Sequence, residues 1–123
     1  MPRYISFALT TKQIRDQTKT VTRRKGWKFF KTGTILNACV KFRGLRPGEK
    51  IQKICQIRVT GVEQQPLDSM CFPNCEYGRD EARKEGFPEL HGDAFVQMFC
   101  EHMGGEEDQT ITRIEFEYLE GKR

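Results

Sequence analysis

The sequence lacks two features that would place a chain in a membrane or direct it to one. None of its apolar runs approaches the length of a membrane span, and no charged-then-apolar leader of the signal-peptide kind opens it. The 123 residues are enough to build one domain with a proper core. We therefore expect a single domain over residues 1–123 that is soluble and cytoplasmic, with no membrane partner.

Cysteine and histidine are too few or too irregularly spaced to indicate a disulfide framework or a metal site. The five cysteines are an odd number in a chain without a leader, so reduced thiols are expected. Cys71 and Cys75 could begin a zinc site, but a structural zinc site needs four ligands. The other candidates, His91, Cys100 and His102, stand at no standard spacing. We expect neither a metal nor another cofactor.

Acidic residues are nearly absent from the first half of the chain. Residues 1–60 hold fifteen Lys/Arg and two Asp/Glu, whereas residues 61–123 hold six Lys/Arg and fifteen Asp/Glu. A basic half is the usual footprint of a phosphate-bearing partner, which makes RNA or a nucleotide the expected ligand. The alternative is that the two halves neutralise each other across a compact fold.

Residues 19–24 concentrate cations and hydroxyl groups around one apolar residue. They are Lys19, Thr20, Val21, Thr22, Arg23 and Arg24. Because side chains alternate between the two faces of a strand, Val21 would face the core. Thr20, Thr22 and Arg24 would then line a cleft or surface on the opposite face. Lys19 has the wrong parity and can join Thr22 only if the chain bends where the strand begins. A solvated basic edge strand is the alternative interpretation.

The next segment, residues 25–34, interleaves aromatic side chains with lysines. Its aromatic residues are Trp27, Phe29 and Phe30, and its lysines are Lys25, Lys28 and Lys31. Such a pattern can stack bases and neutralise phosphates, but we favour burial of at least two of the aromatics, because exposing all three is costly. Trp27, with Lys28 beside it, is the candidate for ligand contact.

The order of predicted elements indicates a small curved sheet with helices over its openings. Apolar periodicity predicts strands at residues 4–9, 19–24, 35–42, 51–62 and 110–119. Helices are predicted at about 10–18, 79–85 and 92–103, with a capping box at Thr10–Gln13 and a core stripe of Phe95, Met98, Phe99 and Met103. Ile111 and Ile114 have opposite parity, which indicates a bulge or burial on both faces. We expect an α+β fold, a β-barrel of about five to six strands with short flanking helices.

Several motifs, spread over nearly the whole chain, match the pattern of one known family. Gln17–Arg24 fits Gly/Gln-x-Lys-Thr-x-Thr-x-Arg after a short first helix. Further matches are Lys31–Gly33, Glu85–Phe87, Phe95–Phe99 and Thr112–Phe116. Together they resemble the ASCH domain, a branch of the PUA-like β-barrel superfamily, and the resemblance implies that fold for this chain.

The resemblance also implies candidate activities. Some ASCH proteins are small amidohydrolases that remove the acetyl group from N4-acetylcytidine, and others are described as RNA-binding or ribonuclease-like. By motif, the catalytic residues of the amidohydrolase branch correspond to Lys19, Thr22 and Glu85 in this sequence, with Arg24 as the nearby cation. A threonine hydroxyl needs a base to become a nucleophile, and a desolvated lysine of lowered pKa can be that base. The carboxylate can orient the lysine or pass the proton to the leaving amine.

Binding of RNA or a modified nucleotide is the first hypothesis, ahead of amidohydrolysis of an acylated cytidine and ribonuclease action. An insertion at residues 64–78 and the heavy basic half depart from the amidohydrolase branch and favour a polynucleotide ligand. A ribonuclease would lack a histidine pair near the cations, because His91 and His102 both lie in the acidic half. The expected binding residues are Lys19, Thr20, Thr22, Arg23, Arg24, Trp27 and Lys28.

Overall fold

The computed structural model describes residues 3–28, 30–41, 44–71 and 75–119. Within these ranges the strands are β1 (Arg3–Ser6), β2 (Val21–Arg24), β3 (Ile35–Cys39), β4 (Lys53–Pro66) and β5 (Thr110–Tyr118). The helices are α1 (Thr11–Arg15), α2 (Cys75–Lys84) and α3 (Gly92–Met103), and a 3₁₀ turn, η1, spans Leu67–Met70. None of the helices in these ranges is both long and apolar enough to span a bilayer.

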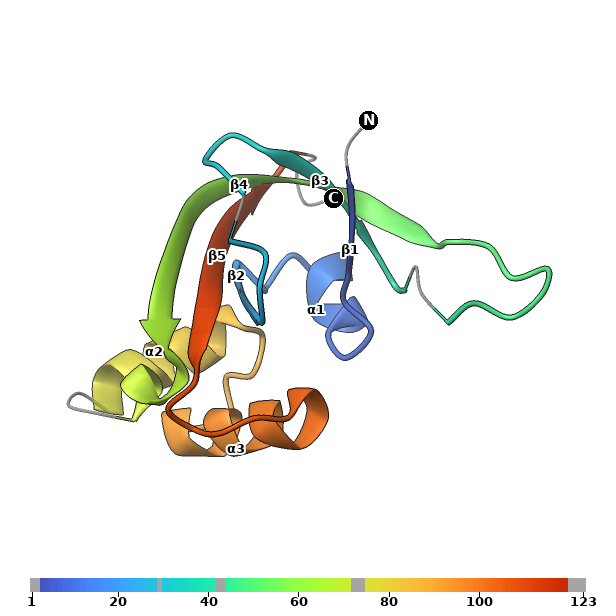
Figure 1. Ribbon diagram of the computed structural model, residues 1–123. Helices are drawn as coiled ribbons and strands as arrows, with labels where there is room; N and C mark the ends of the chain where they lie inside the picture. Colours follow the sequence, from blue (N-terminus) through green and yellow to red (C-terminus); the bar gives the residue numbers. More distant parts are fainter. Residues whose placement is uncertain (1–2, 29, 42–43, 72–74, 120–123) are drawn as a thin grey trace.

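The strands form one curled sheet in the order β1-β3-β4-β5-β2 (Figure 1). β1 runs parallel to β3, and the other neighbours pair antiparallel. Among the described residues the edge strands β1 and β2 are not ladder neighbours, so the sheet is a half-barrel with an open seam. The predicted α+β fold with short flanking helices is confirmed, and its five strands, within the predicted five to six, curl into a half-barrel.

A bulge in β4 bends the sheet. The register against β5 shifts between Val59 and Gly61, so Thr60 is an extra residue on the β4 side. β4 continues to Pro66, four residues beyond its predicted end at 62, and the Gln65 side chain there hydrogen-bonds to Tyr77 of α2. The long bent strand therefore connects the half-barrel to the helices below it.

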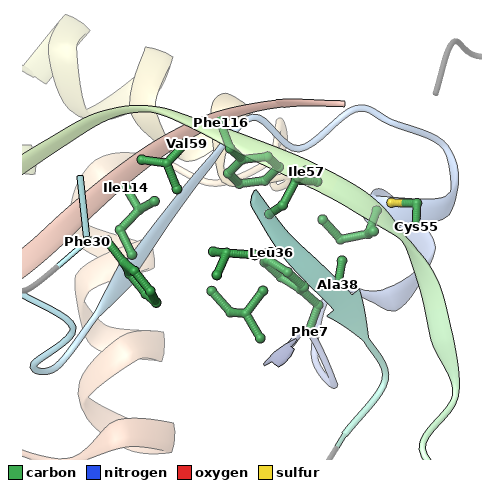
Figure 2. Close-up of a cluster of buried hydrophobic side chains, with 11 residues drawn as sticks. Phe7, Phe30, Leu36, Ala38, Cys55, Ile57, Val59, Ile114 and Phe116 are labelled. Carbon is green, nitrogen blue, oxygen red and sulfur yellow. The ribbon is translucent and has the colours of Figure 1, made fainter. Parts of the chain in front are cut away.

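The concave face of the half-barrel holds the first core cluster (Figure 2). Its buried members are Ile5, Phe7, Ile14, Phe30, Leu36, Ala38, Cys55, Ile57, Val59, Ile114 and Phe116. Ile14 is the one buried residue of α1, so this short helix is held on the sheet mainly by that side chain. Helices this short are marginal alone and depend on such packing.

A second core cluster lies where α2, α3 and η1 pack on the far part of β5. Its buried members are Leu67, Met70, Ala82, Phe95, Val96, Phe99 and Ile111. Ile111 belongs to this cluster and Ile114 to the first, and both are fully buried. The opposite parity of the two isoleucines is therefore explained by burial on both faces of β5, since the register shift lies in β4.

The two longer helices meet around one backbone carbonyl. A Cβ atom on Gly78 of α2 would lie 1.7 Å from the Met70 carbonyl oxygen, and one on Gly92 of α3 would lie 2.1 Å from it. Only glycine allows both helices to approach η1 this closely. These glycines fix the position of α2, from whose end Glu85 projects.

The predicted capping box at Thr10–Gln13 is wrong. Thr10 makes no side-chain capping hydrogen bond, and Gln13 Nε2 instead donates to the carbonyl oxygen of Gly86 at 3.1 Å. The Thr11 hydroxyl donates to the carbonyl oxygen of Phe7 at 2.8 Å, which tightens the turn before α1. A long-range partner therefore replaced the local one that the spacing suggested.

Other predicted boundaries moved. β1 ends at Ser6, and Leu9, expected on the buried face of a strand, is 54% exposed. β3 ends at Cys39, short of the predicted end at 42, and Phe42 and Phe29 lie outside the described residues. α2 begins at Cys75, four residues before the predicted helix start at 79.

We expect Gly78→Ala to destabilise the protein by about 3 kcal/mol or more, because the added methyl group overlaps the Met70 carbonyl. Helix propensity alone predicts the opposite sign, a gain of about 1 kcal/mol. Gly61→Ala is the matched control, since its Cβ would lie 3.8 Å from Glu115, an ordinary contact. Urea unfolding of both variants measures the difference, and equal midpoints would contradict the packing account.

Candidate functional site

A pocket lies at the open seam, between the end of β1, β2 and α3. Its cavity volume is about 130 Å³. The polar residues at its β2 end are Lys19, Thr22, Arg23, Arg24 and Glu85. Its apolar walls include Phe7, Leu9, Phe87, Phe95, Met98, Phe99 and Met103. An apolar pocket with a few convergent polar groups is the usual form of a small-ligand site.

Lys19 enters the pocket through a bend in the chain. Gln17 has a φ of 60°, in the left-handed region, and this turns the backbone between α1 and β2. The Tyr118 hydroxyl donates to the Lys19 carbonyl oxygen at 2.5 Å and fixes the main chain there. Lys19 and Thr22 consequently line the same pocket despite their opposite parity.

The Lys19 side chain is buried and fully engaged by Glu85. Lys19 Nζ donates to Glu85 Oε1 at 2.8 Å and to the Glu85 carbonyl oxygen at 2.7 Å. Both side chains are only 3% exposed. Burial lowers the pKa of Lys19 below its ordinary value, although the adjacent Glu85 carboxylate opposes the shift. A neutral lysine is therefore easier to reach here than at the surface.

Arg23 connects the carboxylates of α2 to the sheet. Its guanidinium donates to Glu81 Oε1 at 2.6 Å, to Glu85 Oε2 at 3.1 Å and to Gln65 Oε1 at 2.9 Å. Among the described side chains, Arg23 Nε is the buried polar atom without a hydrogen-bond partner. Arg23 lines the pocket, but these contacts make it a residue that positions Glu85.

Glu81 completes this network on the other side of α2. Its Oε1 accepts a 2.5 Å hydrogen bond from Arg113 Nε, and its Oε2 accepts one of 3.1 Å from Arg113. Burial alone would raise the pKa of Glu81, but the hydrogen bonds and charges of Arg113 and Arg23 outweigh it and lower that pKa to about 2. Glu81 is thus an ionised buried group at all ordinary pH values.

Arg24 bridges the open seam of the half-barrel. It donates from Nε to Thr22 Oγ1 at 3.0 Å and from the guanidinium to the Ser6 carbonyl oxygen at 2.6 Å. Its guanidinium lies 4.9 Å from the centre of the Phe7 ring, within cation–π range. Burial lowers the pKa of Arg24 to about 10, so it stays charged at neutral pH. The Thr22 hydroxyl accepts from Arg24 and keeps its own proton to donate.

Three of the expected binding residues do not line this pocket. Thr20 lies before β2, where its amide donates to the Lys84 carbonyl and its carbonyl accepts from Phe116. Trp27 packs on the first core cluster, with its ring 5.0 Å from that of Phe30. Lys28 is exposed beside it. The strand alternation that grouped Thr20 with Thr22 does not hold, because β2 begins only at Val21.

The wall that α3 contributes was missed in the sequence. The stripe of Phe95, Met98, Phe99 and Met103 was expected to be core only, but these residues also line the pocket, with His102 beside them. Phe95 and Phe99 are buried, whereas Met103 is 46% exposed. Methionines at the exposed end of an aromatic stripe were the available signal, since flexible thioethers are common at binding surfaces.

The described residues contain no group of three or more His, Cys, Asp or Glu side chains arranged to hold a metal ion. The described cysteines form no disulfide, and the candidate zinc ligands Cys71, Cys75 and Cys100 form no such metal-binding group. Lys19, Thr22 and Glu85, the residues that the family resemblance indicates, all line the pocket.

The half-barrel and its flanking helices form a small α+β fold, and comparison with known proteins agrees. No family model and no curated protein matches the sequence. A crystal structure of an Enterococcus faecalis V583 protein, assigned to the family model DUF984, superimposes with a TM-score of 0.61 at 18% identity, covering 97% of this chain and 80% of that one. The crystal structure of an ASCH domain from Lactobacillus crispatus JV V101 superimposes with a TM-score of 0.59 at 16% sequence identity. The match covers 94% of this chain and 78% of that one. The fold is that of the ASCH domain.

We expect Glu81→Gln to destabilise the protein at pH 7 by about 3–5 kcal/mol, because Arg23 and Arg113 lose the carboxylate that compensates their burial. The stability that Glu81 contributes is present above pH 4.5, its unfolded pKa, and is lost as the pH falls toward about 2. The wild type and the variant should therefore converge in acid.

Urea unfolding at pH 7, at about pH 4 and at about pH 2.5 follows this convergence. Glu107→Gln removes the same charge from an exposed position and serves as the control. A gap between wild type and Glu81→Gln that does not change with pH would contradict the ionised, buried state of Glu81.

Proposed function

We propose that this domain binds the base of a nucleoside, a nucleotide or an RNA chain in the seam pocket. The observation that carries the proposal is the division of the pocket into apolar walls and one polar end. A nucleobase has apolar faces and a polar edge, and proteins hold single bases by stacking the faces and hydrogen-bonding the edge. The ASCH fold agrees with this ligand class, which the motif resemblance implied.

The charges at the polar end favour a neutral group over a phosphate. Lys19 and Arg23 both pair with Glu85, and Arg23 pairs also with Glu81. The donors of Arg24 are engaged by two neutral groups, the Thr22 hydroxyl and the Ser6 carbonyl oxygen. Lys19 and Arg23, whose charges are compensated by carboxylates, attract a phosphate weakly, whereas the hydrogen-bonding atoms at this end of the pocket can still read the edge of a base.

Binding is tested by titrating cytidine and N4-acetylcytidine into the protein by calorimetry. Met98→Ala removes part of the apolar wall and should weaken binding about tenfold, the usual effect of lost apolar contact in a pocket. Leu90→Ala is the matched control, since Leu90 packs on the same helical core but does not line the pocket. Equal losses in both variants, or no binding to the wild type, would contradict the proposal.

Amidohydrolysis is the second candidate, and the environment of Lys19 favours it. The lowered pKa of Lys19 makes its neutral amine accessible as a base, and Thr22 lines the same pocket. In this reaction Thr22 Oγ attacks the amide carbonyl carbon and Lys19 takes the hydroxyl proton. Lys19 then protonates the leaving amine, and water hydrolyses the acyl-threonine ester to the free acid.

The other two charged groups have supporting roles in this candidate. Glu85 holds Lys19 by two hydrogen bonds and would orient it toward the hydroxyl. Arg24, which donates to Thr22 Oγ1, would stabilise negative charge that develops on that oxygen.

If the candidate is right, Thr22→Ala abolishes turnover of N4-acetylcytidine while ligand binding remains measurable. Thr22→Ser keeps the hydroxyl and should retain part of the activity, which separates loss of the nucleophile from damage to the pocket. Product release followed by chromatography provides the rate. Activity of Thr22→Ala near that of the wild type removes Thr22 from the mechanism, and an inactive wild type leaves binding as the function.

A further inference from the structure

A group of exposed cations lies outside the pocket, on the hairpin between β3 and β4 and at Lys53, the first residue of β4. Residues 41–53 contain five Lys/Arg and one acidic residue. No carboxylate of a described residue pairs with Arg46, Lys50 or Lys53, and the ion pair within the described part of this segment joins Lys41 Nζ to Glu49 Oε1 at 3.4 Å. The helices α2 and α3 lie at the other end of the molecule (Figure 1). The two halves of the chain therefore do not neutralise each other here.

The hairpin has a defined turn that buries almost nothing. The Glu49 amide donates to the Arg46 carbonyl oxygen at 2.9 Å, and the Glu49 carboxylate accepts from the Arg46 amide at 2.9 Å. Pro47 and Gly48, with φ of 82° at the glycine, supply the central residues of a type II turn. Residues 46–53 are all exposed. Ordering such a segment costs conformational entropy that no core contact repays, which points to a function on its surface.

The parallel pairing of β1 with β3 places the base of this hairpin next to residues that line the pocket. Ser6 pairs with Cys39, and the Phe7 amide donates to the Cys39 carbonyl oxygen at 2.9 Å. The hairpin starts at the next residue, where Val40 donates to the Gln52 carbonyl oxygen at 3.0 Å. Ser6 and Phe7 line the pocket. The basic hairpin thus leaves the sheet at the pocket wall.

We propose that the hairpin is a phosphate-binding arm, with which Arg46, Lys50 and Lys53 hold the backbone of a single-stranded polynucleotide while one of its bases enters the pocket. The proposal rests on the pocket being a base site and identifies its ligand as a chain instead of a free nucleoside. The pocket can reach only a base that is out of the stack, which favours a single strand over a duplex. Exposed cations lose little on meeting phosphate and release counterions, which supplies affinity without sequence preference.

The test measures the affinity of the full chain for a fluorescein-labelled RNA of about 12 cytidines at several NaCl concentrations. The arm variant combines Arg46→Gln, Lys50→Gln and Lys53→Gln. The control variant combines Lys31→Gln, Arg79→Gln and Arg83→Gln, which removes the same charge from exposed positions away from the hairpin. Cytidine binding is measured in parallel by calorimetry.

The arm variant should bind the RNA about tenfold or more weakly at low salt, and its slope of log affinity against log salt should be shallower by about 2, since each phosphate contact to a single strand contributes about 0.7. Its cytidine affinity should equal that of the wild type, and the control variant should keep most of its RNA affinity. A wild-type salt slope in the arm variant, or an equal loss in the control, would overturn the proposal.

The two proposals fail in different ways. Wild-type RNA binding that depends on the arm, together with no cytidine binding, would remove the base pocket and keep the arm as a phosphate site. If the wild type binds cytidine and the arm variant binds RNA as tightly as the wild type does, the base pocket is kept and the arm is removed as a phosphate site. A third outcome is that the wild type binds vesicles of phosphatidylcholine and phosphatidylserine but not RNA, and that the arm variant loses the vesicle binding. This result would overturn the polynucleotide proposal and identify a membrane surface as the partner of the arm.

Discussion

The structure of this site depends on one buried network of ion pairs. In it, the carboxylates of Glu81 and Glu85 pair with Arg23, Arg113 and Lys19. Burying one of these charges alone would cost several kcal/mol, so each is retained only because its partners lie within hydrogen-bonding distance. The network joins α2 to β2 and β5, and thereby positions helix and sheet relative to each other. It also sets the polar end of the pocket, because Lys19 and Glu85 belong to both.

The cations in the basic half of the chain have two different electrostatic roles, depending on whether they belong to this network. Lys19 and Arg23 are compensated by carboxylates and act at short range, as hydrogen-bond donors inside a water-poor pocket. Arg46, Lys50 and Lys53 remain exposed and uncompensated among the described residues, and act through their charge. Composition alone could not distinguish these groups, because both contribute equally to a net charge of +4.

Much of the fold could be predicted from the sequence, because apolar periodicity reflects local burial. The strand character of the β3, β4 and β5 segments followed from it. For Ile111 and Ile114 it left a bulge or two-sided burial open, and the structure shows the burial. What depended on long-range partners could not be predicted. Gln13 bonds to Gly86 instead of capping α1, and Arg23 bonds to α2 carboxylates 58 and 62 residues away. The grouping of Lys19, Thr22 and Glu85 came from motif resemblance, and their lining of one pocket is a finding of the structure.

The most direct test of the central claim, that the seam pocket holds a base, is methyl NMR of the protein with ¹³C-labelled methionine methyl groups during titration with cytidine. Met98 and Met103 line the pocket, whereas Met70 is buried in the helical core outside it and serves as an internal reference. The account predicts saturable shifts of the Met98 and Met103 methyl signals with little change at Met70. No saturable shift at Met98 and Met103, or an equal shift at Met70, would contradict it.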